Sequence, residues 1–444
     1  MPLLADNDEV TAELCVELAT RYGSPLFVYD GTTAVRSLGE LRGALPDGVE
    51  VFYSLKANPN LGLVQLLAAH GARAEVSSLV ELRTALLAGV AGHDVVFVGP
   101  GKSAGELAAC LDAGVYAVVA ESFGELDELQ ALAAARGVTQ RVLVRVNPKE
   151  APAGARLAMG GRARQFGIDE EQVLAAGDLP GRYPALRFAG VHGYLGTRIL
   201  DAATMVANTR QVLDLAERVA AATGIALDAV DVGGGLGVAY FATERDPDLG
   251  ELRAGLAAAV APFRARHPHA RLIVESGRFV AARCGTYVVR VRDVKRSMGV
   301  RFAVTDGGTH HHMAAVGLGS PLRRDFPMVA LDRPDAPATG GWQLTGPLCT
   351  PNDTLAKEAE LPDLAPGDLV GIRRSGAYGP TASPGLFLGH GFPAEVLVHD
   401  GAAHLVRERD EPADLLRKQR PYPVPGAPAP GTGTRERHAW TVTT

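Results

Sequence analysis

Short runs of β-branched and small apolar residues alternate along the chain with longer segments in which leucine and alanine recur at helical spacing. The runs predict eight buried strands, at Val51–Ser54, Ala74–Val76, Val95–Val98, Ala117–Val119, Val142–Val146, Ala189–His192, Ala229–Val232 and Leu272–Val274. Helices are predicted between them, for example at Leu61–His70, Leu79–Leu87, Ala104–Ala113, Phe123–Ala135 and Ala202–Ala222. Strands that alternate with helices indicate parallel βα units, so we expect an α/β fold with a closed (β/α)₈ barrel. An open doubly wound sheet is the alternative.

The pattern changes after Glu275, where strand-like runs are separated by glycine and proline turns. These runs are Gly285–Val294, Arg301–Thr305, Asp368–Arg373, Glu395–Val398 and Ala403–Val406. We therefore expect a C-terminal, mostly β domain over residues 276–420, after a barrel over residues 31–275. The strand candidate Pro25–Asp30 places residues 1–30 with the β domain, and the Pro-, Gly- and Thr-rich segment 421–444 is expected to be a disordered tail.

Composition narrows the class of protein. The chain has 444 residues, 47% of them hydrophobic, and a net charge of −6, which argues against a general nucleic-acid-binding protein. No run of about 18 apolar residues predicts a membrane span, and no signal peptide is visible. The four cysteines form no CxxC pair, so we expect a reducing, cytoplasmic location.

In a barrel of this kind, functional residues collect where the strands end. The residues that follow the predicted strands are Lys56, Glu75, Arg145, His192, Gly233–Gly235, Glu275 and Arg278. Each has an ordinary structural explanation by itself: a solvated lysine, a tight glycine turn, a buried histidine, or an ion pair between Glu275 and Arg145. Such explanations fit the whole set poorly.

Taken together, these residues predict a site for pyridoxal phosphate. Lys56 lies just beyond a buried strand, where desolvation would lower its pKa and expose an amine for imine chemistry. The Gly233–Gly235 turn could direct backbone N–H groups at a phosphate, and Arg278 could add a charged contact. Glu275 could pair with a pyridinium nitrogen, and His192 could lie flat on the ring.

Two other motifs are unconvincing as functional sites. Gly99–Ser103 resembles the end of a P-loop, but Val96 occupies the position of the first required glycine. The run His310–His312 lacks the spacing of metal ligands, so we expect no metal site.

Five motifs resemble those of the fold-type III pyridoxal-phosphate-dependent decarboxylases, which include diaminopimelate, ornithine and arginine decarboxylases. The motifs cover roughly residues 25–409 in order and comprise Phe52–Asn58, Asp231–Gly235, Glu275–Arg278, Gly346–Cys349 and Gly376–Tyr378. The resemblance implies an N-terminal (β/α)₈ barrel and a C-terminal β domain of the alanine racemase and ornithine decarboxylase type. It also implies a homodimer that shares its active sites.

The same resemblance implies roles for individual residues. Lys56 would form an aldimine with the cofactor, Glu275 would pair with its ring nitrogen, and His192 would stack on the ring. The cofactor would also be bound by Glu75, Arg145, Gly233, Gly234, Gly235, Gly277, Arg278 and Tyr378. Cys349 of the partner subunit would manage protonation of the product. Glu75 stands where the family usually has aspartate.

Two departures concern the substrate. Thr350 follows the loop cysteine, where ornithine and diaminopimelate enzymes usually carry an acidic residue. The family's His-x-Gly-Ser pattern reads His192-Gly193-Tyr194-Leu195-Gly196-Thr197, so a phosphate-binding serine is lacking unless Thr197 serves. The motifs Cys349–Asp353, Asp306–Met313 and Ser375–Pro384 resemble a subgroup from natural-product and polysaccharide-associated pathways, whose butirosin-type member decarboxylates glutamate tethered to an acyl-carrier protein.

We therefore expect α-decarboxylation of an amino acid or a carrier-bound aminoacyl group. Substrate contacts are predicted at Cys349, Asp353, Tyr378, Arg323 and Arg324, the two arginines suiting an acidic or phosphopantetheinyl group. The alternatives are a diaminopimelate, ornithine or lysine decarboxylase, an amino-acid racemase of the same fold, and a regulatory protein without activity. Glu275 disfavours a racemase, which commonly places arginine at the pyridine nitrogen.

Overall fold

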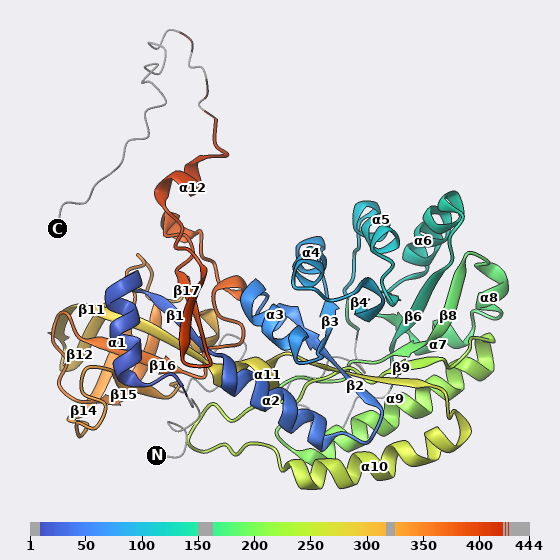
Figure 1. Ribbon diagram of the computed structural model, residues 1–444, viewed down its shortest axis with the longest axis horizontal. Helices are drawn as coiled ribbons and strands as arrows, with labels where there is room; N and C mark the ends of the chain where they lie inside the picture. Colours follow the sequence, from blue (N-terminus) through green and yellow to red (C-terminus); the bar gives the residue numbers. More distant parts are fainter. Residues whose placement is uncertain (1–8, 150–162, 317–324, 421, 423–424, 426–444) are drawn as a thin grey trace.

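A closed barrel of parallel strands forms the larger part of the molecule (Figure 1). The computed structural model describes residues 9–149, 163–316 and 325–420, together with Tyr422 and Pro425. The barrel strands are β2 (Val49–Ser54), β3 (Arg73–Val76), β4 (Val95–Phe97), β5 (Ala117–Ala120), β6 (Gln140–Asn147), β8 (Leu186–His192), β9 (Ala229–Asp231) and β10 (Arg271–Ser276). The pairing of β5 with β6 closes the ring, so the predicted barrel is confirmed.

Helices surround the barrel on its outside (Figure 1). They are α2 (Gly31–Ala44), α3 (Leu61–Ala69), α4 (Leu79–Leu87), α5 (Ala104–Ala113), α6 (Phe123–Arg136), α7 (Glu170–Leu174), α8 (Leu179–Arg182), α9 (Ala202–Thr223) and α10 (Leu249–Arg266). Many begin at a side chain that accepts a hydrogen bond from the first turn, such as Ser78 of α4 and Asp201 of α9. These caps fix where each helix starts after its strand.

The barrel interior is layered. An apolar layer made by residues such as Phe52, Val119, Leu143, Ala229 and Ile273 fills its middle, separately from the main core under the helices. Successive strand residues point to opposite faces, so the residue two positions further along each strand also faces inward. Those positions hold the charged side chains of Glu121, Arg145, Asp231 and Glu275. A polar layer therefore covers the apolar one at the C-terminal end of the strands.

The second sheet forms the mostly β domain that the sequence predicts. Its strand order is β15–β14–β12–β11–β1–β17–β18, with β16 beside β11 and β13 beside β16. The strands are β1 (Leu26–Asp30), β11 (Gly285–Ser297), β12 (Val300–Thr305), β13 (Met328–Ala330), β14 (Gly340–Thr345), β15 (Thr354–Leu361), β16 (Leu369–Arg373), β17 (Ala394–His399) and β18 (Ala402–Arg407). β1 pairs with β11 and β17, which ties the N-terminal segment to this sheet.

Three of these strands, β13–β15, and the helix α1 (Ala12–Tyr22) do not figure among the elements expected from the sequence. β14 opens on two glycines, and β15 carries charged residues in its middle, so neither resembles an apolar run. Tertiary pairing between the two strands supplies the stabilisation that local sequence lacks.

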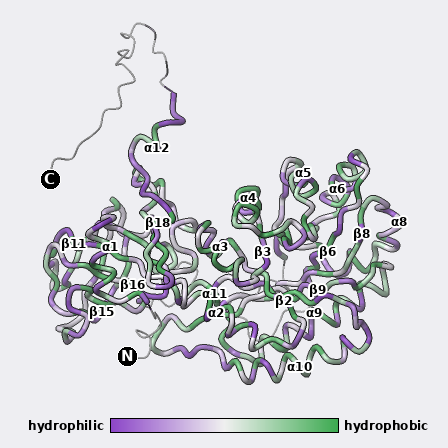
Figure 2. Tube along the Cα trace, viewed as in Figure 1, coloured by the Kyte–Doolittle hydropathy of each residue, from purple (hydrophilic) through white to green (hydrophobic). Residues whose placement is uncertain are grey.

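Short helices connect and extend the two parts. α11 (Arg278–Ala281) follows β10 directly and leads into β11. α12 (Pro412–Leu416) lies in a segment that Figure 2 colours as mainly hydrophilic. In the part of the chain that the structure describes, no helix has both the length and the apolar character needed to span a membrane.

Candidate active site

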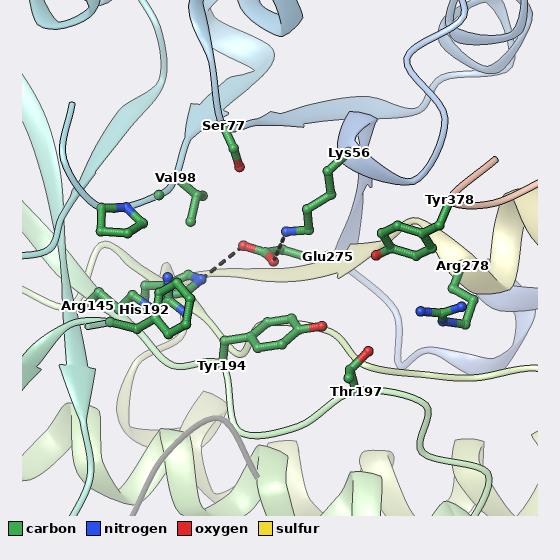
Figure 3. A pocket seen from close by; sticks show the side chains of 13 residues that line it. Lys56, Ser77, Val98, Arg145, His192, Tyr194, Thr197, Glu275, Arg278 and Tyr378 are labelled. Carbon is green, nitrogen blue, oxygen red and sulfur yellow. Dashed lines mark hydrogen bonds and ion pairs between the residues drawn. The ribbon is translucent and has the colours of Figure 1, made fainter. Parts of the chain in front are cut away.

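A cavity of about 450 Å³ lies at the C-terminal end of the barrel strands. Figure 3 shows its side chains, which converge from the strand ends and from the β domain. The lining residues are Lys56, Ser77, Val98, Gly99, Pro100, Arg145, Phe166, His192, Tyr194, Thr197, Glu275, Arg278 and Tyr378. Six of the residues predicted from the sequence therefore meet in one cavity.

Lys56 lies in a 3₁₀ turn, Leu55–Ala57, immediately after β2. Its Nζ is 2.9 Å from Glu75 Oε2 and 3.9 Å from Glu275 Oε2. Burial favours the neutral amine, but the two carboxylates outweigh it and raise the pKa of Lys56 well above its ordinary value. The expectation of a lowered pKa for Lys56 is therefore wrong, because β3 and β10 each bring a negative charge to the amine and outweigh the effect of desolvation.

Glu275 and His192 form a buried pair in the polar layer. His192 Nε2 lies 2.9 Å from Glu275 Oε1, while Glu275 Oε2 is buried and accepts no hydrogen bond from a described residue. Burial opposes ionisation, but Lys56 and then His192 lower the pKa of Glu275 to about 2. Glu275 is therefore an ionised carboxylate with one oxygen held and one directed at the cavity.

His192 lines the cavity, and its expected role as the ring-stacking residue stays a prediction. Its side chain is 0% exposed, and its Nδ1 is also buried without a described partner. The alternative explanation of Glu275 as the ion-pair partner of Arg145 is wrong, because Arg145 pairs with Glu121 instead.

Arg145 and Glu121 are joined by a hydrogen bond of 2.7 Å between the guanidinium and the carboxylate. Glu121 also accepts the backbone N–H groups of Gly99 and Gly167, so it fixes two loops as well as the arginine. The Arg145 guanidinium lies 4.8 Å from the ring centroid of Phe166 at the cavity wall. Glu121 was absent from the predicted site, although its spacing of two from the inward-facing Val119 identifies it.

Asp231 is a second polar residue that the sequence prediction did not assign to the site. It lies two residues after Ala229, and its Oδ1 accepts the N–H of Gly233 at 2.9 Å. Burial and the neighbouring Glu275 raise the pKa of Asp231 well above its ordinary value. The polar layer thus places Asp231, whose burial favours the neutral acid, beside the ionised Glu275.

The Gly233–Gly235 turn packs closely on its neighbours. A Cβ on Gly234 would lie 2.0 Å from the carbonyl oxygen of Glu275, and one on Gly235 would lie 2.2 Å from that of Gly196. Gly233 and Gly235 have φ angles of +69° and +110°, which favour glycine. Since the N–H of Gly233 donates to Asp231, a phosphate at this turn would have to use N–H groups further along.

Arg278 stands at the other end of the cavity from His192 (Figure 3). Its guanidinium donates to the Tyr240 hydroxyl at 3.1 Å and lies 4.4 Å from the ring centroid of Tyr378. No carboxylate of a described residue forms a salt bridge with it. Tyr378 is fixed by its own N–H, which donates to the carbonyl of Ala57 at 2.7 Å. A half-buried cation that lacks a carboxylate partner among the described residues is a fitting partner for a phosphate.

The loop that carries Cys349 lies outside this cavity. Cys349 is exposed, and the nearby Asp353 is 2% exposed. The Asp353 carboxylate accepts the N–H groups of Thr309 and Leu348 at 2.8 and 2.7 Å. Both oxygens are thus used to hold the loop, so the expectation that Asp353 contacts substrate is not supported. Arg323 and Arg324 lie outside the described residues.

Gly277 packs so tightly that a Cβ would lie 2.6 Å from Ala57 Cβ.

A family model described as "Pyridoxal-dependent decarboxylase, pyridoxal binding domain" matches residues 33–282. The match spans more than half of the chain and includes every barrel strand. The chain belongs to the pyridoxal-dependent decarboxylases. It is accordingly a carboxy-lyase, as the lysine, the buried acid and the unpaired arginine of its cavity predict.

Among curated proteins, this decarboxylase is 36% identical over 418 residues to L-glutamyl-[BtrI acyl-carrier protein] decarboxylase of Niallia circulans, covering 93% of this chain and 96% of the relative. It is 30% identical to diaminopimelate decarboxylase of Zymomonas mobilis, covering 92% and 96%. Among solved structures, diaminopimelate decarboxylase of Helicobacter pylori complexed with L-lysine aligns with a TM-score of 0.81 at 27% identity, covering 91% and 98%.

The cavity of this decarboxylase fits a pyridoxal group on its own geometry. Lys56 is the amine that could attach an aldehyde, and Glu275 presents a carboxylate oxygen, Oε2, that accepts no hydrogen bond from a described residue. The uncompensated Arg278 suits a charged substituent at the far end. Lys56 would hold the aldehyde carbon, Glu275 the ring nitrogen and Arg278 the acidic substituent of one planar ligand.

Proposed function

We propose that this enzyme uses pyridoxal 5′-phosphate to remove the α-carboxylate of an aminoacyl group carried on an acyl-carrier protein, with glutamate as the favoured aminoacyl group. The phosphorylated form of the cofactor is supported by Arg278, whose guanidinium lines the cavity and has no carboxylate partner among the described residues. Free pyridoxal would leave that charge without an anion, whereas the phosphate ester supplies one.

When bound, the cofactor supplies an electron sink for the carbanion that remains when carbon dioxide departs. Lys56 must lose a proton before its Nζ can bond to an aldehyde carbon, and Glu75 Oε2 at 2.9 Å is the nearest acceptor. Glu275 would hold a proton on a ring nitrogen placed beside its Oε2, because a carboxylate stabilises the cationic form of the ring. His192 fixes the orientation of that carboxylate through their 2.9 Å contact.

The substrate class is argued from similarity and from charge. The 36%-identical relative is named for a glutamyl carrier-protein substrate, whereas the named diaminopimelate decarboxylases are less similar. Within the described cavity lining, the only carboxylate is Glu275, which the cofactor occupies in this proposal. Thr350 follows Cys349 where a diamine enzyme would carry an acid. Neither place provides a carboxylate for the distal ammonium of a diamine.

We further propose that the enzyme is a homodimer in which the partner subunit's Cys349 reaches the cavity and protonates the product at Cα. The exposure of Cys349 and its absence from the lining of this chain's own cavity support that arrangement. Mixing Lys56→Ala and Cys349→Ala variants tests it, because hybrid dimers would regain activity that neither parent has. No recovery after subunit exchange would contradict shared sites.

The substrate proposal is tested by measuring carbon dioxide release from an L-glutamyl thioester of a carrier protein and of pantetheine. Free glutamate, ornithine, lysine and diaminopimelate are measured beside them, each with and without pyridoxal 5′-phosphate. We expect turnover of the thioesters that requires the cofactor and is abolished in Lys56→Ala. Turnover of diaminopimelate alone would overturn the substrate assignment, and loss of optical rotation without carbon dioxide would indicate a racemase.

A further inference from the structure

The turn that carries Lys56 is hydrogen-bonded to a loop of the β domain, residues 374–378, which brings Tyr378 to the cavity. Figure 3 shows Lys56 and Tyr378 entering the cavity from different segments of the chain. We propose that Asn58 is a positioning residue that ties this turn to the 374–378 loop and so fixes the place of Lys56 relative to Tyr378. The inference rests on the proposed function, because it concerns a ligand that is bound at both ends of the cavity.

Two hydrogen bonds join the Lys56 turn to the 374–378 loop. Asn58 Nδ2 donates to the carbonyl of Gly376 at 3.0 Å, although the two residues are 318 positions apart in the chain. The N–H of Tyr378 donates to the carbonyl of Ala57 at 2.7 Å. Ala57 and Asn58 directly follow Lys56, so a shift of the loop reaches the lysine through one or two residues.

The side chain of Asn58 has a defined orientation. Its Oδ1 accepts the N–H of Asn60 at 3.0 Å, so Nδ2 is the end that is directed at Gly376. The carbonyl of Asn58 also accepts the Tyr53 hydroxyl at 2.9 Å. Asn58 is 6% exposed and is not among the residues that line the cavity. It therefore acts on Lys56 through the backbone and not by touching a ligand.

The 374–378 loop has a conformation that its contacts must maintain. Arg374 and Tyr378 have φ angles of +59° and +57°, in the left-handed region that is unfavourable for residues other than glycine. Such a conformation persists only where the surrounding structure determines it. The N–H of Ser375 supplies one such contact, because it donates to the carbonyl of Gly285 at the start of β11 at 2.8 Å.

A second contact holds the loop from within the β domain. His312 Nε2 lies 2.8 Å from Ser375 Oγ, and both residues are 0% exposed. Ser375 Oγ donates its own proton to the carbonyl of Ile372 at 2.8 Å, so His312 is the donor in their contact. His312, the last residue of the run His310–His312, thus fixes the segment that Asn58 binds.

This arrangement matters for a ligand that uses both ends of the cavity. A pyridoxal group without a phosphate is bound at Lys56 but has no anion for Arg278, beside which Tyr378 lies at 4.4 Å from guanidinium to ring centroid. The phosphate ester uses both ends in the proposed function. The affinity gained from a second binding point depends on its position relative to the first before the ligand binds. Loosening the Asn58 contact therefore reduces the gain from the phosphate and spares binding at Lys56.

The experiment compares two ligands by spectrophotometric titration of the apoprotein. They are pyridoxal 5′-phosphate and 5′-deoxypyridoxal, which has the same ring and aldehyde but no phosphate. The dissociation constant of 5′-deoxypyridoxal divided by that of pyridoxal 5′-phosphate measures the gain from the phosphate. We expect Asn58→Ala to lower this ratio about three- to tenfold. The matched control is Asn208→Ala, because Asn208 is also 6% exposed but lies in α9 and does not line the cavity. It should keep the wild-type ratio.

The ratio separates positioning from a general loss of stability, which would weaken both ligands by the same factor. Ser375→Ala covers the case in which Asn58→Ala does not fold, because it removes the contact with His312 and should also lower the ratio. A wild-type ratio in Asn58→Ala, or in Ser375→Ala where Asn58→Ala does not fold, overturns the positioning role. Failure of the wild-type protein to bind pyridoxal 5′-phosphate, or equal affinity of the wild type for the two ligands, would instead overturn the proposed function.

Discussion

Replacing Glu275 by glutamine removes one buried negative charge and keeps almost the same shape. The amide oxygen can still accept a hydrogen bond from His192, whose Nε2 lies 2.9 Å from the present carboxylate. Glutamine cannot hold a proton on a ring nitrogen by charge, however. The substitution therefore separates the electrostatic contribution of Glu275 from its packing.

The size of that contribution follows from the pKa of Glu275. Its surroundings shift it from 4.5 to about 2 against the opposing effect of burial. At about 1.4 kcal/mol for each pKa unit, the cavity favours the charged carboxylate by roughly 3 kcal/mol. A protonated ring nitrogen would take the place of the Lys56 charge beside Glu275. If it gains a similar energy during decarboxylation, Glu275→Gln lowers the rate by about two orders of magnitude.

The assay is carbon dioxide release at saturating cofactor and substrate, with cofactor content measured for each variant. We expect Glu275→Gln to lower kcat about a hundredfold, and Glu275→Asp, which retains the charge, to lose less. The control is Glu395→Gln, another buried acid changed in the same way, which lies in β17 and accepts hydrogen bonds from Tyr29 and Asn60. A kcat of Glu275→Gln within about threefold of the wild-type value would refute the electrostatic reasoning.

Three further predictions concern attachment, packing and pH. Lys56→Ala should gain no mass from pyridoxal 5′-phosphate after borohydride reduction, whereas the wild-type chain gains one adduct by intact-mass measurement. Gly233→Ala should lower the free energy of unfolding in urea by about 1–3 kcal/mol. The reason is that φ is +69° and the new Cβ would lie 2.4 Å from the Gly193 carbonyl oxygen. The control is Gly39→Ala in a helix with open space around the new Cβ, which should leave stability unchanged or raise it. Burial lowers the pKa of His310 from 6.5 to about 4, and the pKa values of His311 and His312 from 6.5 to about 3. Below pH 6.5 these histidines therefore bind protons in the unfolded chain and stay neutral in the folded chain. Stability should therefore fall with decreasing pH, and His312→Gln should reduce that dependence by about 1.4 kcal/mol per pH unit between 6 and 5 in denaturant titrations; an unchanged dependence would contradict the assignment.

The fold could be predicted largely because its signals are local. Most barrel strands are short apolar runs followed by a helix with its own side-chain cap, and this repetition indicates a parallel barrel before any tertiary contact is known. Lys56, Glu275 and Arg278 could be placed in one site for the same reason, since all three follow barrel strands. Strands β14 and β15 were not predictable in this way, because their stability comes from pairing with each other.

What the sequence determined by itself is which residues reach the C-terminal end of the barrel, because strand periodicity fixes the side to which each side chain points. Only the tertiary structure decided which of them meet. It placed His192 in contact with Glu275 and the ring of Tyr194, two positions further along the chain, near the amine of Lys56. It also set the protonation of Lys56, because the pKa of this lysine depends on two carboxylates from other strands. Glu75 of β3 lies 19 residues along the chain from Lys56, and Glu275 of β10 lies much further along it. The effect of a charge on a pKa depends on its distance in space, and the local sequence does not specify that distance.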